Sequence, residues 1–333
     1  MIEYECENPN LTLKEIVHDI SIHGELCNSR NGMTLAFKEP VRIRHIDPKR
    51  RVIWLKSRNA NPFFHIFEFV WMLAGRKDVK TISAFNGNMK SYSDDGISFN
   101  APYGYRLKHH FGHDQLNEVI EILKKDPDSR QAVALLWDNA DLTKNTKDKA
   151  CNLELVFKVR DGKLDMTVFN RSNDLIWGAL GANLVHMSFF HEYVATKVGI
   201  PMGAYEQVSN CLHVYTDGVA GNILKNILAD DPEGCDYKVR YINTRNSPSM
   251  VGIDEDVSKL FYHIGICKDV TGMMSGFVQE YQSDFFNRLF IPMMMTYAFH
   301  KLKMDTTAMD ILIGSNIPQD WKLACYNWLD NRK

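Results

Sequence analysis

The stretch from residue 150 to residue 215 contains side chains that together could hold a nucleotide and attack its base. Cys151 is the candidate nucleophile, because a thiol can form a covalent intermediate once nearby positive charge favours the thiolate. Arg171 and Ser172 set a guanidinium beside a hydroxyl, which suits a phosphate group. Asn183 carries an amide that can both donate to and accept from the edge of a base. These residue types predict thiolate attack on a bound anionic substrate.

Further candidates extend this set. Arg30 lies in a glycine-containing loop whose backbone could approach an anion closely, and Arg130 borders a predicted strand. His213 and Tyr215 are two residues apart, so in a strand they would share one side and could donate to a sugar hydroxyl. Glu68 lies among aromatic residues of a predicted helix. In a cleft, desolvation would raise its pKa and suit it to proton transfer.

Each candidate also has a structural interpretation, which is the commoner one for that residue taken alone. A lone cysteine such as Cys151 is usually a small apolar filler. An isolated arginine such as Arg30 or Arg171 is usually solvated at the surface, and Glu68 could lie on the wet face of its helix. Neither arginine loop matches a P-loop or a GxGxxG motif, so the sequence does not favour a nucleoside triphosphate or dinucleotide site.

Composition limits the classes of function. The chain has 333 residues, 45% of them hydrophobic, which is enough for one large domain or two ordinary ones. The net charge of -2 gives no general attraction for long nucleic acid, so an anionic ligand must meet a local cluster. The seven cysteines form no CxxC pair and no zinc-site spacing, so we expect no metal and reduced thiols. No signal peptide or membrane-spanning run is recognised. We therefore expect a cytoplasmic protein, in the host cytoplasm if a phage encodes it.

Hydrophobic periodicity predicts the elements that must position these residues. Asn61-Pro62 should open the helix that carries Glu68, and Gly75 should end it. Asp161-Gly162 is a strong hairpin signal. The other predicted helices are around Val17–Ile22 and over Leu116–Lys125, Leu184–Val198 and Phe285–Leu302, the last kinked or split at Pro292. The predicted strands are Val41–Arg44, Val52–Leu55, Ala132–Trp137, Leu153–Val159, Leu164–Phe169 and Leu212–Tyr215.

The order of short motifs resembles thymidylate synthase and its relatives, the pyrimidine nucleotide hydroxymethylases, over most of the chain. Each motif is weak alone, but together and in this order they are specific. The motifs are Arg30, Glu68, Tyr103-Gly104, Ser129-Arg130, Cys151, Arg171-Ser172-Asn173-Asp174, Asn183 and His213-Val214-Tyr215.

The resemblance implies a mechanism. Cys151 would attack C6 of the pyrimidine, and C5 would then take one carbon from 5,10-methylenetetrahydrofolate without a metal. Glu68 and Asn183 would organise proton transfer at the base. The other implied roles are phosphate binding by Arg30, Arg171 and Ser172, and by Arg130 across a homodimer interface, further substrate binding by Tyr103, sugar binding by His213 and Tyr215, and cofactor binding by Asp174 and Met89.

The resemblance also implies the architecture: an α+β fold with a mixed, twisted sheet flanked by helices, dimerising sheet against sheet. We assign residues 1–230 to the catalytic domain. Residues 231–333 would form the C-terminal part of the same domain, with an extension that diverges from the family.

Several departures from the methylating members favour a hydroxymethylase. The methylating members have a second arginine where this chain has Gln131, and their cysteine is flanked by proline and histidine instead of Ala150 and Asn152. Met89 aligns with the tryptophan that keeps water from the methylene intermediate, although Tyr92 could compensate. The chain ends in a polar segment and not in the apolar tail that closes over the folate. Both changes would let water reach the intermediate.

The choice of base is less determined by the sequence. Asn183 suits uracil, because its amide both donates and accepts, whereas hydroxymethylases that act on deoxycytidylate have an aspartate there. The segment from Asp174 to Asn183 is one residue longer than in the family, which would put Ala182 at the base-reading position. The run Gly178–Asn183 also looks like cytidylate hydroxymethylases, so we favour deoxycytidylate or cytidylate over deoxyuridylate. Thymidylate synthase activity and a non-catalytic nucleotide-binding role remain alternatives.

Overall fold

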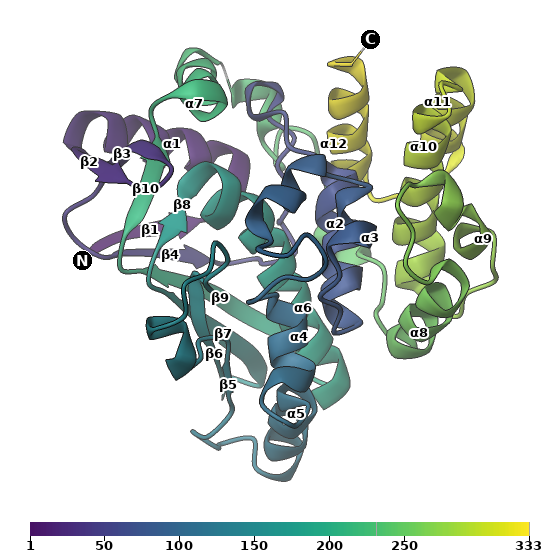
Figure 1. Ribbon diagram of the computed structural model, residues 1–333, viewed down its shortest axis with the longest axis horizontal. Coiled ribbons are helices and arrows are strands. Elements are labelled where there is room, and N and C mark those ends of the chain that lie inside the picture. The colour runs from purple at the N-terminus through teal and green to yellow at the C-terminus, as the bar shows by residue number, and fades with distance from the viewer. Residues whose placement is uncertain (231, 333) are drawn as a thin grey trace.

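The computed structural model describes residues 1–230 and 232–332, and two β-sheets organise the chain up to residue 215 (Figure 1). Both sheets mix parallel and antiparallel pairs, so the fold is mixed α+β, as predicted. The larger sheet has the order β1 (Ile2–Cys6), β4 (Val41–His45), β9 (Met202–Ser209), β7 (Lys163–Asn170), β6 (Asn152–Arg160), β5 (Val133–Leu135). The smaller has the order β2 (Glu25–Ser29), β3 (Gly32–Ala36), β10 (Leu212–Tyr215), β8 (Asn173–Asp174).

Helices pack on one face of the larger sheet, where α6 contacts β7 and β9, and α1 contacts β1. The α-helices are α1 (Pro9–His23), α2 (Pro62–Leu73), α3 (Val79–Ser83), α4 (Tyr103–Tyr105), α5 (Gln115–Lys125), α6 (Asn183–Val198), α7 (Gly218–Ala229), α8 (Ile253–Ile264), α9 (Met274–Phe277), α10 (Ile291–Lys301), α11 (Asp305–Gly314) and α12 (Gln319–Asp330). Shorter 3-10 or π segments are η1 (Lys56–Arg58), η2 (Gly87–Tyr92), η3 (Arg106–His110), η4 (Asn139–Leu142), η5 (Leu175–Ala182), η6 (Pro232–Cys235), η7 (Thr244–Asn246), η8 (Thr271–Met273) and η9 (Phe286–Phe290).

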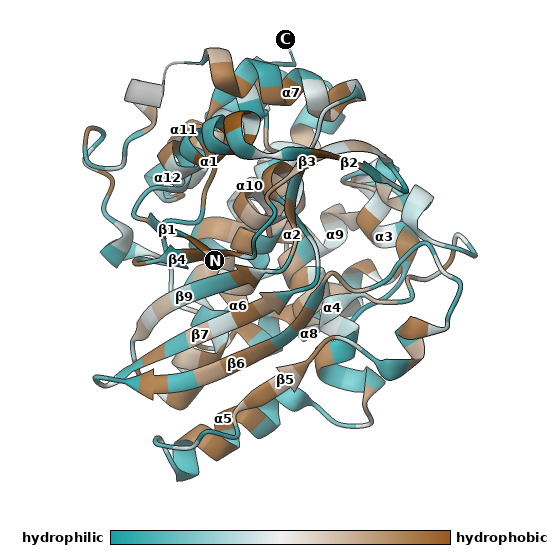
Figure 2. Ribbon diagram, turned by 90° about the vertical axis from the view of Figure 1, so that its left-hand side faces the viewer, coloured by the Kyte–Doolittle hydropathy of each residue, from teal (hydrophilic) through white to brown (hydrophobic). Residues whose placement is uncertain are grey.

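The β6–β7 hairpin follows the predicted pattern. Asp161 and Gly162 both have positive φ, 50° and 70°, which matches the twist of a two-residue hairpin turn. Alternation along β7 buries Met166 and Val168 completely under the helices. Phe169 lies on the other face and is half-buried. Figure 2 shows this outer face of β9, β7 and β6 toward the viewer, uncovered by the described helices.

Helix α2 begins as predicted. The Asn61 side chain accepts from the Phe64 backbone N–H at 3.1 Å and so caps the first turn. The helix ends at Leu73, and Gly75 follows with φ of 64°. We expected one apolar face, but nearly every side chain is buried, because α6 packs on one side and α10 and α12 pack on others.

One predicted strand was wrong. Residues Val52 to Leu55 are buried but irregular. The fully buried Asn10 replaces a strand partner there: it donates to the Val52 carbonyl (3.1 Å) and accepts from the backbone N–H of Trp54 (2.8 Å) and Leu55 (3.2 Å). The expected mixed sheet is the larger one, and a second, smaller mixed sheet lies beyond it, because the chain continues from β7 into β8 and from β9 into β10.

The C-terminal helices pack beside α2 and α6, away from the sheet (Figure 1). The predicted helix Phe285–Leu302 is divided next to Pro292 into two elements, η9 and α10. Pro292 occupies the first turn of α10, where its missing N–H is tolerated, directly after the π segment η9. The predicted domain boundary involves residue 231, which is outside the described residues. Across residues 1–230 and 232–332, none of the helices combines the length and apolar character needed to cross a bilayer.

Candidate active site

Most predicted site residues gather where strands of the larger sheet pass into the smaller one. Strand β7 continues into β8 through residues 171–172, and β9 continues into β10 through residues 210–211. The Arg171 backbone N–H donates to the Cys151 carbonyl at 3.0 Å, which ties the first crossing to the residue that precedes β6. The candidate nucleophile and the Arg171-Ser172 pair, far apart in sequence, are therefore neighbours in space.

The Arg171 guanidinium lies directly on the Cys151 thiol. Its Nη2 is 3.7 Å from Sγ, and the same guanidinium donates to the carbonyls of Ala150 (2.8 Å) and Lys149 (3.2 Å). Burial raises the pKa of the Cys151 thiol, while the positive charges of Arg171 and Arg30 act to lower it. The arrangement provides the positive charge that a thiolate requires.

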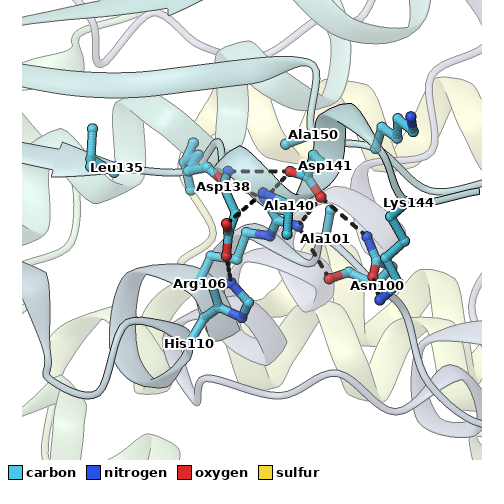
Figure 3. Close-up of polar contacts among 12 residues, drawn as sticks. Asn100, Ala101, Arg106, His110, Leu135, Asp138, Ala140, Asp141, Lys144 and Ala150 are labelled. Atoms are coloured by element: carbon cyan, nitrogen blue, oxygen red, sulfur yellow. Dashed lines mark hydrogen bonds and ion pairs between the residues drawn. The ribbon is translucent and has the colours of Figure 1, made fainter. Parts of the chain in front are cut away.

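A buried ion pair braces the segment that leads to Cys151 (Figure 3). Both oxygens of Asp141 accept from the two terminal nitrogens of Arg106, whose side chain is 1% exposed. The carboxylate of Asp148 accepts from the Ala101 backbone N–H at 2.8 Å. Paired, charge-assisted bonds of this kind define direction as well as distance. They fix the loop after β5, and with it the position of the thiol.

Arg30 reaches this loop from the β2–β3 hairpin. Its Nη2 donates to the Lys147 carbonyl at 3.0 Å, and its charge lowers the pKa of Cys151. Arg30 and Arg171, which are far apart in sequence, therefore both lie near Cys151. Ser172 is half-buried at the crossing between β7 and β8, next to Arg171.

Arg130 does not join this cluster within the same chain. It is exposed in the turn before β5, beside Ser129, whose carbonyl accepts from Lys158 Nζ at 3.5 Å. Lys158 lies seven residues along β6 from Cys151, roughly 23 Å at the rise of an extended strand. An Arg130 side chain cannot span that distance, so any role at a Cys151 site requires a second copy of the chain.

Glu68 faces the interior and not solvent. Its side chain is 13% exposed, and burial raises its pKa to about 8. The carboxyl lies 3.4 Å from Nε2 of His186 on α6, and burial lowers the pKa of His186 to about 3. His186 follows Asn183 by three residues on the same helix face. Glu68 is therefore protonated at neutral pH. It contacts α6 at His186, one helical turn from Asn183.

Asn183 begins α6 and takes part in a buried network of amides. Its Nδ2 donates to Asn173 Oδ1 at 3.1 Å and lies 3.4 Å from Asn152 Oδ1. The extra residue before it is absorbed by η5, where Leu180 and Gly181 leave helical geometry. Asn183, and not Ala182, therefore contacts the residue after Cys151.

Asp174, His213 and Tyr215 line the smaller sheet beside this network. Asp174 Oδ1 accepts from the backbone N–H of Ile176 (2.8 Å) and Trp177 (2.7 Å). Among the described residues its buried Oδ2 and the buried Nδ1 of His213 have no hydrogen-bond partner. Burial raises the pKa of Asp174. The His213 and Tyr215 rings meet edge to face, 5.5 Å apart.

Tyr92 is the residue of η2 that reaches the site. Burial raises its pKa, and the nearby Tyr215 and Asp174 add to that shift. Met89 is half-buried and packs against the core. The compensation by Tyr92 that the sequence suggested is therefore geometrically possible.

Tyr103 opens α4 against the same loop. Burial raises its pKa and the nearby Cys151 thiol adds to the shift, while the backbone at Asn152 and Cys151 acts to lower it. Gly104 allows this approach, because a Cβ there would lie 1.9 Å from the Met72 carbonyl oxygen.

The sequence interpretation missed several residues of the site. Arg58 stacks over the exposed Trp177 ring at 4.4 Å and donates to the Ile176 carbonyl at 2.9 Å. Gln207 and Asn173 form the amide network below Asn183. None of these residues lies at a motif position to which the resemblance assigns a role. For Asn173 and Gln207, the only indication in the sequence was the number of amide side chains near the motifs. Within residues 1–230 and 232–332, no three His, Cys, Asp or Glu side chains are arranged to hold a metal.

Comparison with known proteins agrees with this arrangement. The thymidylate synthase family model matches residues 12–246. A deoxyuridylate hydroxymethyltransferase of Pseudomonas phage M6 is 38% identical over 343 residues, covering 99% of this chain and 94% of that protein. One of Bacillus phage SP01 is 43% identical over 241 residues, covering 68% of this chain and 62% of that protein. One of Delftia phage PhiW-14 is 29% identical over 204 residues, covering 58% of this chain and 56% of that protein. The chain belongs to the thymidylate synthase family.

Proposed function

We propose that the protein is a one-carbon transferase that hydroxymethylates C5 of deoxyuridylate (dUMP). Its relatives in three phages carry that substrate in their names. The proposal therefore takes uracil, and not the cytosine that the sequence favoured. The observation that carries the proposal is the pairing of Cys151 with Arg171 beside Asn183 and a protonated Glu68.

The chemistry follows from these groups. The Cys151 thiolate adds to C6 of uracil, which makes C5 nucleophilic. Methylenetetrahydrofolate supplies one carbon at the oxidation level of formaldehyde. Glu68 and Asn183 handle the protons and hydrogen bonds of the ring while C5 exchanges its hydrogen for that carbon. Water adds its oxygen, the thiolate leaves C6, and the net products are hydroxymethyl-dUMP and tetrahydrofolate.

The phosphate and sugar have matching partners. Arg30, Arg171 and Ser172 surround the thiol with the donors that a phosphate needs. Tyr103 adds a hydroxyl beside Cys151. His213 and Tyr215, on the same side of β10, offer donors to the sugar.

The folate could satisfy an unpaired hydrogen-bond acceptor at Asp174. Among the described residues, Asp174 Oδ2 is buried and lacks a partner, and a pterin ring offers N–H donors to such a carboxylate. Met89 and Tyr92 lie on the neighbouring segment η2. Asp174 would hold the ring in place, and this contact would also satisfy the carboxylate.

A homodimer completes the proposal. The outer sheet face has an apolar centre around Val156, Phe169 and Val208, with Arg42 paired to Glu206 at its edge (2.9 Å). Packing two such faces together would bury this centre and bring Arg130 of one subunit to the phosphate site of the other. Residues 1–230 and the C-terminal part would act as one domain in each subunit.

Product mass after incubation with methylenetetrahydrofolate and either dUMP or deoxycytidylate (dCMP) tests the function. Addition of CH2O to dUMP is expected. Addition of CH2 with release of dihydrofolate would make the protein a thymidylate synthase, and no product from either nucleotide would indicate a binding protein. Cys151→Ser should lower turnover by at least about 1,000-fold while nucleotide binding persists. Unchanged turnover would rule out the covalent route.

A further inference from the structure

A continuous chain of side-chain hydrogen bonds runs from the Ala179 backbone carbonyl to Asn183. Gln207 Nε2 donates to Ala179 O at 2.8 Å, and Gln207 Oε1 accepts from Asn173 Nδ2 at 3.2 Å. Asn173 Oδ1 then accepts from Asn183 Nδ2 at 3.1 Å. Asn173 is 2% exposed and Gln207 1%, so solvent does not compete for these bonds.

The direction of this chain is fixed at its buried end. A backbone carbonyl can only accept, so the Gln207 atom that faces Ala179 must be Nε2. The other Nε2 hydrogen points to His45 Nε2 at 3.0 Å, and burial lowers the pKa of His45 to about 3, so this neutral ring accepts. Reversing the Gln207 amide would set its oxygen against the Ala179 oxygen. The Asn173 amide must then follow the same direction, and Asn183 must present Nδ2 to it.

Among the described residues, the Asn183 oxygen accepts no hydrogen bond, so it is the free end of this chain of amides. One Nδ2 hydrogen is committed to Asn173, and the second faces Asn152 Oδ1 at 3.4 Å. We propose that Gln207 and Asn173 are positioning residues that hold the Asn183 amide in one orientation and so make the site prefer uracil over cytosine. The inference rests on the proposed function, because it requires a pyrimidine at Asn183.

The preference follows from the hydrogen at N3. Uracil carries N3–H, which can donate to the Asn183 oxygen. Cytosine carries a lone pair at N3, which would face that oxygen as a second acceptor. A free Asn183 amide could rotate by half a turn and accommodate cytosine. The amide chain opposes that rotation, because it would leave the buried Asn173 oxygen facing another oxygen.

Binding affinity for dUMP and dCMP, measured by calorimetry in a Cys151→Ala background, tests the inference without any turnover. The measured quantity is the ratio of the two dissociation constants. Gln207→Leu and Asn173→Leu should each reduce the preference for dUMP by roughly tenfold. Asn173→Asp should retain the preference, because a buried carboxyl in its protonated form can still accept from Asn183 Nδ2 and donate to Gln207 Oε1.

Two controls separate positioning from a general structural role. Ser209→Ala removes a side branch, since Ser209 Oγ accepts from Asn173 Nδ2 at 3.2 Å without leading to Asn183, and should retain the preference. In an Asn183→Ala background, Gln207→Leu should change the ratio no further. Circular dichroism would establish that each variant is folded.

Certain results would overturn the inference. A folded Gln207→Leu protein that keeps the full preference for dUMP would do so, as would an Asn173→Asp protein that loses it as Asn173→Leu does. Failure of the proposed function is distinguishable. The wild-type protein would then yield no hydroxymethyl product from dUMP, whereas the binding ratios still report on the amide chain. Equal wild-type affinity for the two nucleotides would also reject the inference.

Discussion

Glu68 and His186 illustrate how burial alone sets protonation at the residue scale. Their side chains approach to 3.4 Å, yet the contact is not an ion pair at neutral pH. Burial penalises whichever form carries charge, so it raises the pKa of the acid to about 8 and lowers that of the imidazole to about 3. Both groups are therefore neutral at pH 7.

This protonation predicts how stability depends on pH. Between about 4.5 and 8 the folded protein keeps a proton on Glu68 that the unfolded chain has released, so the free energy of unfolding decreases as pH rises through this window. Glu68→Gln mimics the protonated acid. The difference in free energy of unfolding between Glu68→Gln and wild type should therefore shift in favour of the variant by on the order of 1 to 3 kcal/mol from pH 5 to pH 9. Urea unfolding at the two pH values measures this difference.

Glu118→Gln provides the matched control, since Glu118 is an exposed carboxyl on α5. A Glu68→Gln protein whose stability relative to wild type is the same at pH 5 and pH 9 would show that the carboxyl is already ionised in the fold. The Glu68→Gln enzyme should also lose activity, because an amide cannot supply the proton.

At the scale of elements, η5 sets where Asn183 begins α6. Leu180 and Gly181 leave helical geometry within this π segment, directly before Asn183. This geometry depends on Gly181, because a Cβ there would lie 2.5 Å from the Ile176 carbonyl oxygen. Asn183 consequently keeps its contacts with Asn173 and Asn152.

Gly181→Ala should therefore displace η5. The clash is with backbone, which cannot move aside cheaply, so we expect a loss of about 1 to 3 kcal/mol in stability. The KM for nucleotide should rise as Asn183 moves. Thermal unfolding and steady-state kinetics measure the two effects. Gly314→Ala is the control, since nothing lies within 4 Å of a Cβ at that site. Equal behaviour of the two variants would contradict this role for η5.

At the scale of the whole molecule, the proposed dimer would give the exposed Arg130 a role at the site of a second subunit. One subunit holds Cys151, Arg171 and Arg30 together, but its own Arg130 lies at the far end of β6. The uncovered face of the larger sheet (Figure 2) offers a surface over which a second subunit could pack.

Mixing two inactive variants tests this arrangement. Arg130→Ala protein and Cys151→Ala protein should each be impaired, since each lacks a required group at both sites. A mixed dimer would contain one site with Cys151 from one subunit and Arg130 from the other, so activity should return after co-refolding. Ion-exchange separation of the mixed species would identify it. Absence of any recovery, with mixed dimers present, would place Arg130 outside the site.

The sequence by itself determined the family, the β6–β7 hairpin, the helices α1, α2, α5 and α6, and several of the residues around Cys151. Those features depend on local patterns: the Asn61 cap, the Asp161-Gly162 turn and motifs in a fixed order. It also raised the question of Asn183 against Ala182, which a residue count cannot answer. The irregular Val52–Leu55 segment could not be predicted either, because its backbone partner is Asn10, more than forty positions away.

Only the tertiary structure decided what depends on groups remote in sequence. Burial sets the protonation of Glu68, and that burial comes from helices along the whole chain. Hydrogen bonds from Gln207 through Asn173 set the direction of the Asn183 amide. Spacing identifies which side chains could do chemistry. Their charge and orientation depend on desolvation and hydrogen-bond partners, and folding alone supplies both.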